Sequence, residues 1–349
     1  MKRFSILIAA LCLCLTGCGK QTTEATAQIF AMDTVMEVAA YGEHAEQAVK
    51  YTEKRIEELE NRLSRTKADS LVSGLNRDGS IRHLTYDYWN LIARAKEYRD
   101  ATNGAFDITI APVMDAWGFT GDSFRVPEQS ELDTLLKKVN SDAIQMLGSP
   151  SDSVTLGEGQ AIDLGGIAKG YTSDWVEQTF RANGIESGKI SLGGNVFVLG
   201  GKPDGSDWRV GIKDPRNESG LAAILSLRDA YAITSGGYER YFEENGKTYH
   251  HIIDPSTGYP ADSGLLSVTV VAADNGPDWA GAGNGAMCDA FSTALFVMGE
   301  EQALDFWRNG GYDFDLVLVT EDGRVVITAG LADRFEEVKD SGYTYETVF

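Results

Sequence analysis

Residues 163–171 read DLGGIAKGY, with a glycine pair between an acidic residue and a stretch of helical periodicity that continues to residue 183. Backbone N–H groups at a helix start can hold anionic oxygens, and glycines let a ligand approach closely. Lys169 could then cover a phosphate or carboxylate, and Asp163 could accept a hydrogen bond from a ribose or a ring N–H. The spacing matches neither GxxxxGK[ST] nor GxGxxG. A helix capped by Asp163, with glycines that serve only packing, is an equal alternative.

A second segment with reactive side chains is HHIIDPSTGYP, residues 250–260, which reads as a short strand followed by a turn. Two of the four histidines of the chain lie here, so proton transfer or phosphate contact is one interpretation. Adjacent residues of a strand point to opposite faces, so only one of His250 and His251 can face a site. A histidine with a purely structural role at a strand end is an equal alternative.

A third segment, CDAFSTAL at residues 288–295, places Asp289 and Thr293 four residues apart. On a helix these two side chains stack on one face. A carboxylate and a hydroxyl are hard oxygen ligands, which suit magnesium better than zinc. Taken alone, the segment favours a simpler interpretation, in which Asp289 caps the helix and Thr293 bonds back to a backbone carbonyl.

Apolar periodicity along the rest of the chain predicts an α+β fold, a single body with mixed or antiparallel sheets and packed helices. Strands and helices do not alternate regularly, which argues against a doubly wound parallel sheet. The predicted helices are residues 45–63, 88–98, 132–139, 165–183, 289–298 and 303–307. The predicted strands are residues 28–41, 195–199, 208–212, 223–227, 267–272 and 315–319.

The N-terminus reads as a lipoprotein signal. Two positive residues precede an apolar run, residues 4–15, that is too short to span a bilayer, which needs about 20 apolar residues. Small residues directly before Cys18 look like a lipobox, so we expect cleavage after residue 17 and acylation of Cys18. A signal peptide that merely contains a cysteine is the alternative. Residues 18–27 are then the lipidated N-terminus and a flexible tether, and residues 28–349 the functional domain.

The composition limits the classes of partner. Loss of residues 1–17 would remove two basic residues and no acidic ones, so the formal charge would move from −21 to −23. So acidic a chain is a poor candidate for binding nucleic acid. An anionic ligand would need a local metal ion or lysine. Cys288 is the only thiol left in the body, so export would not involve disulfides there.

Together these segments resemble the ApbE family of FAD:protein FMN transferases, over nearly all of residues 28–349. The blocks that carry the resemblance follow in order: Met32-Asp33-Thr34, Ser64 through Ser70 to Asn76, Gly104-Ala105-Phe106-Asp107, PVMDAWGF (112–119), DLGGIAKGY, SLGGNVFVLG (191–200), WRVGIKDP (208–215), ITSGGYERYF (233–242), HHIIDPSTGYP and DAFSTALFVMG (289–299).

The resemblance implies a set of site residues. The FAD contacts fall on Met32, Ala105, Phe106, Asp107, Asp163, Lys169 and His251. The magnesium ligands fall on the Asp289 carboxylate, the Thr293 hydroxyl and the backbone carbonyl of Gly166, and His251 and Asp289 are the catalytic candidates. His250 is then expected to face away.

Two positions depart from the family pattern. Asp33 replaces the usual glycine of the first block, and Thr66 stands where many members carry a tyrosine over the flavin. The implied activity is magnesium-dependent transfer of the FMN half of FAD to a Thr or Ser hydroxyl of an acceptor protein, with release of AMP. The acceptor expected is an exported or membrane electron-transfer subunit, met by a lipid-anchored enzyme at the outer face of the cell membrane. A magnesium-dependent FAD pyrophosphatase, which Thr66 favours, and a non-catalytic FAD-scavenging lipoprotein are the alternatives.

Overall fold

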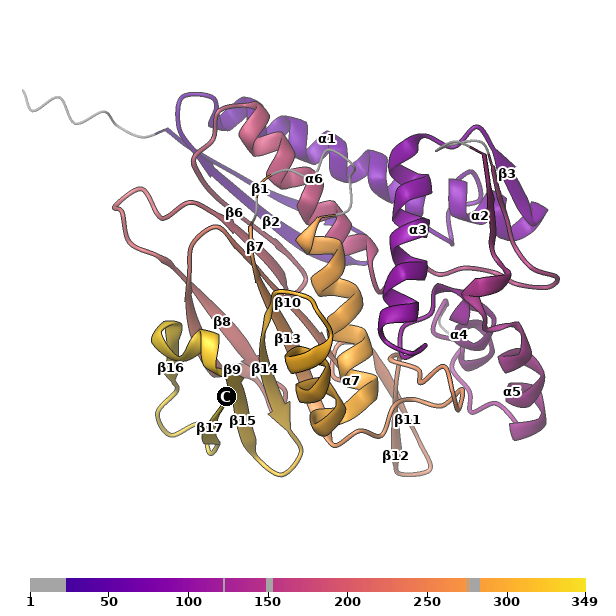
Figure 1. The fold of residues 1–349 in the computed structure, drawn as a ribbon. Coiled ribbons are helices and arrows are strands. Elements are labelled where there is room, and N and C mark those ends of the chain that lie inside the picture. The colour runs from indigo at the N-terminus through magenta and orange to yellow at the C-terminus, as the bar shows by residue number, and fades with distance from the viewer. Residues whose placement is uncertain (1–22, 122, 149–152, 275, 277–282) are drawn as a thin grey trace, which may run out of the picture.

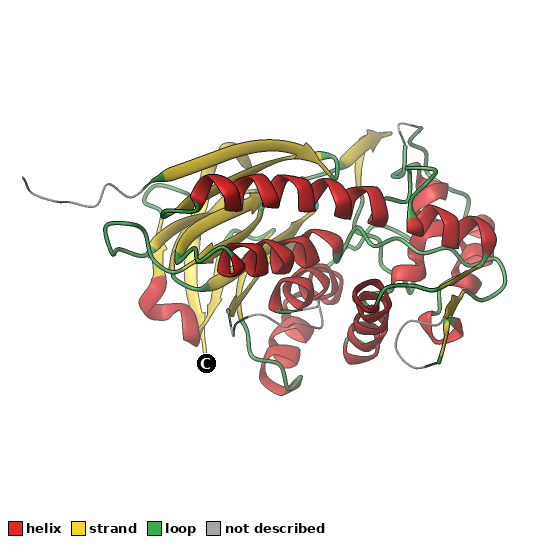
Figure 2. Cartoon of the chain, turned by 90° about the horizontal axis from the view of Figure 1, so that it is seen from above, coloured by secondary structure: helices red, strands yellow, loops and turns green. Residues whose placement is uncertain are grey.

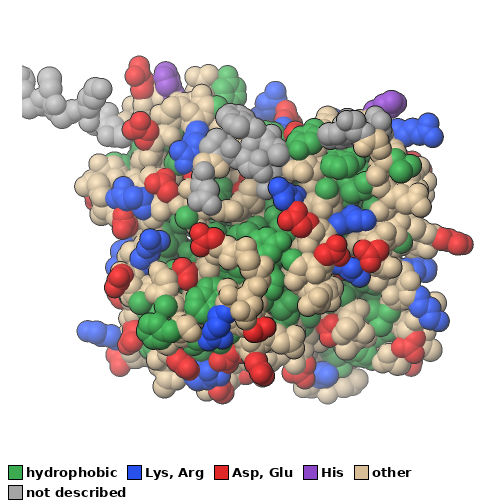
Figure 3. All heavy atoms as spheres, viewed as in Figure 1, with side chains coloured by type: hydrophobic (Ala, Val, Ile, Leu, Met, Phe, Trp, Pro, Cys, Tyr) green, Lys and Arg blue, Asp and Glu red, His purple; other side chains and the backbone are tan. Residues whose placement is uncertain are grey.

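The structure, a computed structural model, describes residues 23–121, 123–148, 153–274, 276 and 283–349. The predicted signal and the lipidation site at Cys18 lie outside these residues. No helix in the described part of the chain has both the length and the apolar character needed to cross a membrane. Figure 3 shows acidic and basic side chains interspersed over one face, despite the net charge of −21.

A nine-stranded sheet forms the main layer (Figure 1). All its neighbouring strands are antiparallel except the last pair, β15 and β17, which is parallel. In spatial order the strands are β1 (Glu24–Ala31), β2 (Thr34–Tyr41), β6 (Ser187–Leu192), β7 (Asn195–Leu199), β10 (Ala230–Gly236), β13 (Leu265–Ala273), β14 (Asp315–Thr320), β15 (Arg324–Thr328) and β17 (Thr344–Val348).

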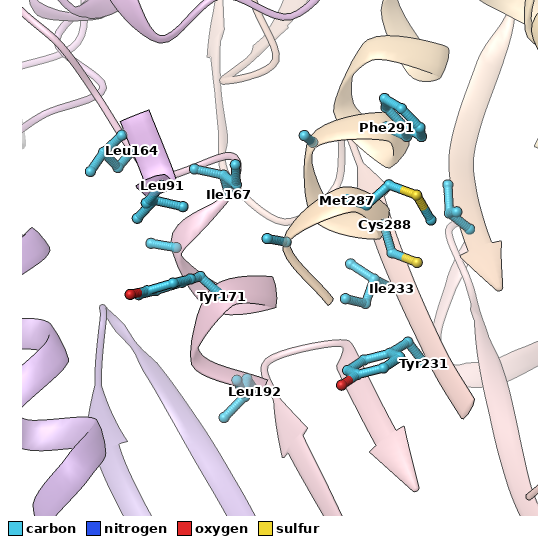
Figure 4. Packing of buried hydrophobic residues seen from close by; sticks show 14 of the residues in the cluster. Leu91, Leu164, Ile167, Tyr171, Leu192, Tyr231, Ile233, Met287, Cys288 and Phe291 are labelled. Atoms are coloured by element: carbon cyan, nitrogen blue, oxygen red, sulfur yellow. The ribbon is translucent and has the colours of Figure 1, made fainter. Parts of the chain in front are cut away.

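Three helices cover one face of this sheet: α1 (Ala45–Leu63), α6 (Ala168–Ala182) and α7 (Asn284–Asn309) (Figure 2). Successive side chains of a strand point to opposite faces, so the apolar residues of the central strands are divided between the two faces of the sheet. In β13, Val268 and Val270 pack with the helices, whereas Val271 faces the other side. Figure 4 shows the helix side of the core, where Tyr171 on α6 and Met287 and Cys288 on α7 meet residues of the sheet.

A smaller sheet covers part of the opposite face. It consists of β8 (Trp208–Asp214), β9 (Asn217–Leu227) and β16 (Phe335–Glu337), preceded by a 3-10 segment at Ala329–Arg334. Alternate apolar residues of β8 and β9 share a second core cluster with Val271. The arrangement is therefore helix, sheet, sheet, with two separate apolar layers.

The remaining helices gather in a lobe at one end of the sheet (Figure 1). This lobe contains α2 (Leu71–Asp78), α3 (Tyr86–Ala101), α4 (Ala111–Trp117) and α5 (Gln129–Leu135), 3-10 turns at Ile108–Ile110, Leu136–Lys138 and Ser141–Ala143, the small sheet β3 (Ser80–Arg82), β5 (Ser153–Thr155) and β4 (Gln145–Leu147), and the hairpin β11 (Tyr241–Glu244) and β12 (Lys247–His250). Trp117 anchors an aromatic cluster there and donates its indole N–H to the carbonyl of Gly258, 2.7 Å away.

The predicted α+β class is confirmed, but the prediction of a single opening strand is wrong. Instead of one opening strand at residues 28–41, the chain forms a hairpin, and β1 begins at Glu24, inside the predicted tether. Residues 24–29 form a strand because apolar and polar residues alternate: Ala25, Ala27 and Ile29 face the core, and their polar neighbours face solvent. A segment rich in Thr and Ala lacks strong periodicity, yet eight pairs with β2 fix its register.

Two helix boundaries also differ from the prediction. The helix behind the glycine pair begins at Ala168, because residues 165–167 form a turn. The segments 289–298 and 303–307 belong to α7, which begins at Asn284 and is interrupted only at Gly299, with φ 79° and ψ 172°. That left-handed φ favours glycine, so one residue bends the helix without ending it.

Candidate functional site

Two glycines let α6 and α7 approach each other closely. A Cβ atom at Gly170 would lie 2.0 Å from the carbonyl oxygen of Gly285, and a Cβ at Gly285 would lie 2.4 Å from that of Gly170. No side chain fits either position, because real Cβ contacts are longer than 3 Å. The close crossing brings Asp289, on the turn after Gly285, against the first turn of α6.

Asp289 is buried and accepts two hydrogen bonds from other segments. Its Oδ2 lies 2.8 Å from the backbone nitrogen of Gly170, and its Oδ1 lies 3.0 Å from Nδ2 of Asn195 on β7. Asp289 therefore caps α6 from a neighbouring helix rather than capping its own, since α7 begins five residues earlier. Burial raises the pKa of Asp289, whereas the positive charge of Lys169 and these hydrogen bonds act to lower it.

The Thr293 hydroxyl lies one turn further along α7 and contacts a second hydroxyl. Ser235 Oγ, on β10, is 3.1 Å from Thr293 Oγ1 and 2.8 Å from Ser292 Oγ. The predicted bond back to a backbone carbonyl belongs to Ser292, which donates to the carbonyl of Asp289. Gly166 lies against Thr293, since a Cβ at Gly166 would be 3.5 Å from Thr293 Oγ1.

These residues fit the requirements of a magnesium site. Each Asp289 oxygen has one protein donor and retains a lone pair, and Thr293 supplies a hydroxyl beside it. Among the described residues, Oδ1 of the buried Asn195 has no hydrogen-bond partner, so another oxygen acceptor is left unsatisfied at this point of the fold. A glycine at position 166 leaves its backbone free to approach, as a carbonyl ligand requires.

The two histidines have different surroundings. His250 Nε2 lies 3.1 Å from the carbonyl of Ala261, and its ring packs edge-on against Phe296. His251 Nδ1 lies 3.1 Å from the carbonyl of Arg240, so Nδ1 carries the proton and Nε2 is the acceptor. Burial lowers the pKa of His251 to about 4, and Lys169 contributes in the same direction. His251 is therefore neutral at pH 7 and close enough to Lys169 to sense its charge.

Asp163 does not cap the following helix. Its Oδ1 accepts from the backbone N–H of Gly165 at 2.7 Å, and its Oδ2 accepts from Arg65 at 3.0 Å. Arg65 also donates to Asp115 at 2.7 Å, which joins the glycine-rich turn to the helical lobe. Asn76 pairs with both backbone groups of Ile162 and holds the segment that leads into this turn.

Met32 occupies the tip of the β1–β2 hairpin. Met32 and Asp33 have φ values of 50° and 58°, so both turn residues are left-handed and Asp33 adopts the conformation usual for glycine. The Met32 N–H donates to Glu60 of α1 at 2.9 Å, and the Met32 sulfur lies 3.7 Å from the hydroxyl of Thr172, one turn along α6 from Lys169. The hairpin tip is thus fixed beside the first turns of α6.

Ala105 is half-buried against the core, and Phe106 and Asp107 have separate roles. Phe106 is buried against Gly166, since a Cβ added at Gly166 would lie 3.1 Å from the Phe106 ring. The carboxylate of Asp107 is buried and accepts from the N–H and hydroxyl of Thr109 and from the N–H and hydroxyl of Ser141. This carboxylate is therefore committed to structure. The N–H groups of Ala105 and Phe106 are also used, because they donate to the carbonyl and the hydroxyl of Thr102.

The structure thus places Gly166, Lys169, His251, Asp289 and Thr293 at one junction between α6, α7 and the segment after β12. Four further residues support this junction and were missed from the sequence: Asn195, Ser235, Ser292 and Arg65. All four lie inside blocks that carry the family resemblance, which was the only available signal for them. Thr66 lies at the exposed end of α1, with its hydroxyl 3.0 Å from that of Ser64.

Known proteins resemble this chain in sequence and in fold. A sequence model of the ApbE family matches residues 32–316. An FAD:protein FMN transferase of Treponema pallidum is 31% identical over 307 residues, which cover 83% of this chain and 82% of that protein. One of Klebsiella pneumoniae is 33% identical over 294 residues, covering 82% and 86%.

Solved structures resemble the whole body of the chain. The crystal structure of the ApbE protein from Thermotoga maritima has a TM-score of 0.77 and 30% identity, over 91% of this chain and 97% of that one. The apo form of the flavinyl transferase ApbE of Pseudomonas stutzeri has a TM-score of 0.73 and 27% identity, over 86% and 92%.

Proposed function

The chain belongs to the ApbE family, and on that premise we propose that it transfers the FMN half of FAD to a protein hydroxyl with the help of Mg²⁺. The acceptor is a threonine or serine of another protein. Its oxygen forms a bond to the phosphorus of the FMN half, the pyrophosphate P–O bond to the AMP half breaks, and AMP leaves. The proton of the hydroxyl passes to a base of the enzyme.

The observation that carries this proposal is the position of the Asp289 carboxylate. It faces the N-terminus of α6, beside Lys169 and one helical turn from the Thr293 hydroxyl. Bound between Asp289, Thr293 and the carbonyl of Gly166, Mg²⁺ would neutralise charge that develops on the pyrophosphate and make AMP a better leaving group. The protein groups are held before substrate arrives, because Gly170, Asn195 and Ser235 fix their orientation.

Lys169 and His251 have complementary parts in the proposed reaction. Lys169 supplies positive charge for the phosphates. His251 is neutral and presents Nε2 as an acceptor, so it can orient the incoming hydroxyl. Its pKa of about 4 makes it a weak base. Asp289 is the other candidate to take that proton.

We further propose that the enzyme is held by acyl chains on Cys18 at the outer face of the cell membrane. The short apolar run before Cys18 and the small residues beside it support this location. The acceptor would then be an exported or membrane electron-transfer subunit, since enzyme and acceptor would meet at the same surface.

The test is an incubation of the full chain, in detergent, with FAD, Mg²⁺ and a threonine-bearing domain of a flavinylated electron-transfer protein. We expect the intact mass of the acceptor to rise by one FMN, with one AMP released, and both signals to vanish with EDTA or in Asp289→Ala. Release of AMP without gain of mass would instead indicate a pyrophosphatase, the reaction that the missing aromatic ring at Thr66 favours. Bound FAD with neither signal would indicate a carrier.

A further inference from the structure

Strand β1 forms one edge of the nine-stranded sheet, and half of its backbone groups are unpaired. The N–H of Gly42 donates to the carbonyl of Thr23, which fixes the phase of the β1–β2 ladder. Residues 25, 27, 29 and 31 therefore exchange hydrogen bonds with β2, whereas the backbones of Thr26, Gln28 and Phe30 point outward. These three residues have no hydrogen bond from their backbone N–H groups among the described residues.

A groove of about 640 Å³ runs between this open edge and one side of α1. Its wall on the strand side is residues 28–31, and its wall on the helix side carries three acidic and two basic residues, at positions 53, 57, 60, 50 and 54. Lys67 and Asn61 close the groove near the end of α1. An extended peptide that pairs with β1 would thus have alternate side chains against a polar, mixed-charge helix face.

The outer face of the same hairpin carries one exposed apolar pair near the turn. Phe30 and Val35 are directly opposite each other in the ladder, with 75% and 56% of their surfaces exposed. They form a non-hydrogen-bonded pair, in which the side chains lie closest together. Natural edge strands are usually protected by Lys, Pro or a bulge, and β1 has none of these in eight residues with unbroken register.

The groove leads to the proposed site. The hairpin turn at Met32 bonds to Glu60, which also lines the groove, and it contacts Thr172 of α6. On the other side of the turn, Thr34 lies against Gly193, two residues before Asn195, which in turn bonds to Asp289. A strand laid along β1 toward Met32 would therefore carry its next residues toward the Asp289 junction.

We propose that β1 is the docking strand for the acceptor protein, and that an extended acceptor segment adjoining the modified Ser or Thr pairs with its open edge. This inference rests on the proposed transferase function and deepens it by naming the recognition mode. Main-chain hydrogen bonds to Thr26, Gln28 and Phe30 supply affinity, and an apolar acceptor side chain beside Phe30 supplies preference. The acceptor is favoured over a second copy because the open edge ends at the junction where its hydroxyl must arrive.

The test uses Gln28→Pro in the full chain, with Gln28→Ala as the matched control. Proline removes the outward N–H of residue 28 and leaves the β1–β2 hydrogen bonds intact, which is the position where an edge strand tolerates it. We expect the KM for the acceptor to rise at least about 10-fold in Gln28→Pro, as for the loss of roughly 1.4 kcal/mol of binding. The KM for FAD and the kcat should stay within about twofold of Gln28→Ala, as expected when only acceptor binding is weakened.

An unchanged acceptor KM in folded Gln28→Pro would overturn the inference while leaving the transferase function intact, whereas absence of transfer by the wild-type chain would overturn the function itself. If Gln28→Pro fails to fold, a photo-crosslinking residue introduced at Phe30 gives the second measurement. A crosslink to the acceptor supports the docking strand. A crosslink only to another copy of the chain, or to lipid or detergent, overturns it.

Discussion

Replacing Gly170 with alanine tests whether the crossing of α6 and α7 builds the site. The new Cβ would lie 2.0 Å from the Gly285 carbonyl oxygen and 2.6 Å from the Asp289 Cβ. An ordinary contact is longer by more than 1 Å, and both neighbours belong to α7, so the two helices must separate. Overpacking of this kind costs about 1–3 kcal/mol. Loss of the 2.8 Å bond from the Gly170 N–H to Asp289 strands a buried acceptor and costs about 1–3 kcal/mol more.

We therefore expect Gly170→Ala to lower the free energy of unfolding by about 2–6 kcal/mol. Urea denaturation monitored by circular dichroism measures this decrease in the free energy of unfolding. Repeating it with FAD and Mg²⁺ shows whether the variant is still stabilised by these ligands. Gly74→Ala in α2 is the matched control, because its Cβ would meet nothing closer than 3.8 Å. That change should stabilise the protein by roughly 0.5–1 kcal/mol. A Gly170→Ala protein as stable as wild type, with the same response to FAD and Mg²⁺, would refute the argument.

Three further predictions concern single side chains. Ser235→Ala removes the hydroxyl partner of Thr293, so the Mg²⁺ concentration for half-maximal transfer should rise about 10-fold in a magnesium titration, with the KM for FAD unchanged. His251 has a folded pKa of about 4 against an ordinary value of 6.5, so the unfolded chain binds its proton first and stability falls as pH drops from 6.5 to 4. His251→Gln should remove this part of the slope, at most about 1.4 kcal/mol per pH unit, in urea titrations at each pH; an identical slope would contradict the assignment. Asp107→Ala should lower the free energy of unfolding by about 2–4 kcal/mol, because four donors from Thr109 and Ser141 lose their acceptor. The FAD affinity of Asp107→Ala, measured by fluorescence titration under conditions where the variant is folded, should change less than twofold if the carboxylate is structural.

The elements that periodicity predicts best are those that cover one face of a layer. The predicted helix at 45–63 is α1, whose seven buried residues, from Ala45 to Leu63, recur at three- and four-residue spacing. The strands at 195–199, 208–212 and 315–319 lie inside β7, β8 and β14. Alternate residues of β7 and β14 face separate apolar clusters, whereas those of β8 face one cluster and solvent. Local pattern suffices where burial repeats with the period of the element.

Contacts between distant segments escaped prediction. Ser235 is 58 residues from Thr293, and Asn195 is 94 residues from Asp289, so no local pattern links either pair. The cap of α6 could not be predicted for the same reason, because the acceptor is Asp289 of α7 and not Asp163 before the helix. The edge hairpin was missed because Glu24–Ala31 owes its conformation to pairing with β2 rather than to its own propensity.

The strand order of the large sheet has a consequence for how the protein is made. From β1 to β17 the strands lie side by side in the order in which they occur along the chain, with helices inserted between them. A chain that emerges with its N-terminus first can therefore add every new strand to an existing edge, and no later strand has to force open a completed ladder. Biosynthesis can thus assemble the sheet in one direction, and β14, β15 and β17 are added only after the strands and helices of the junction have been synthesised.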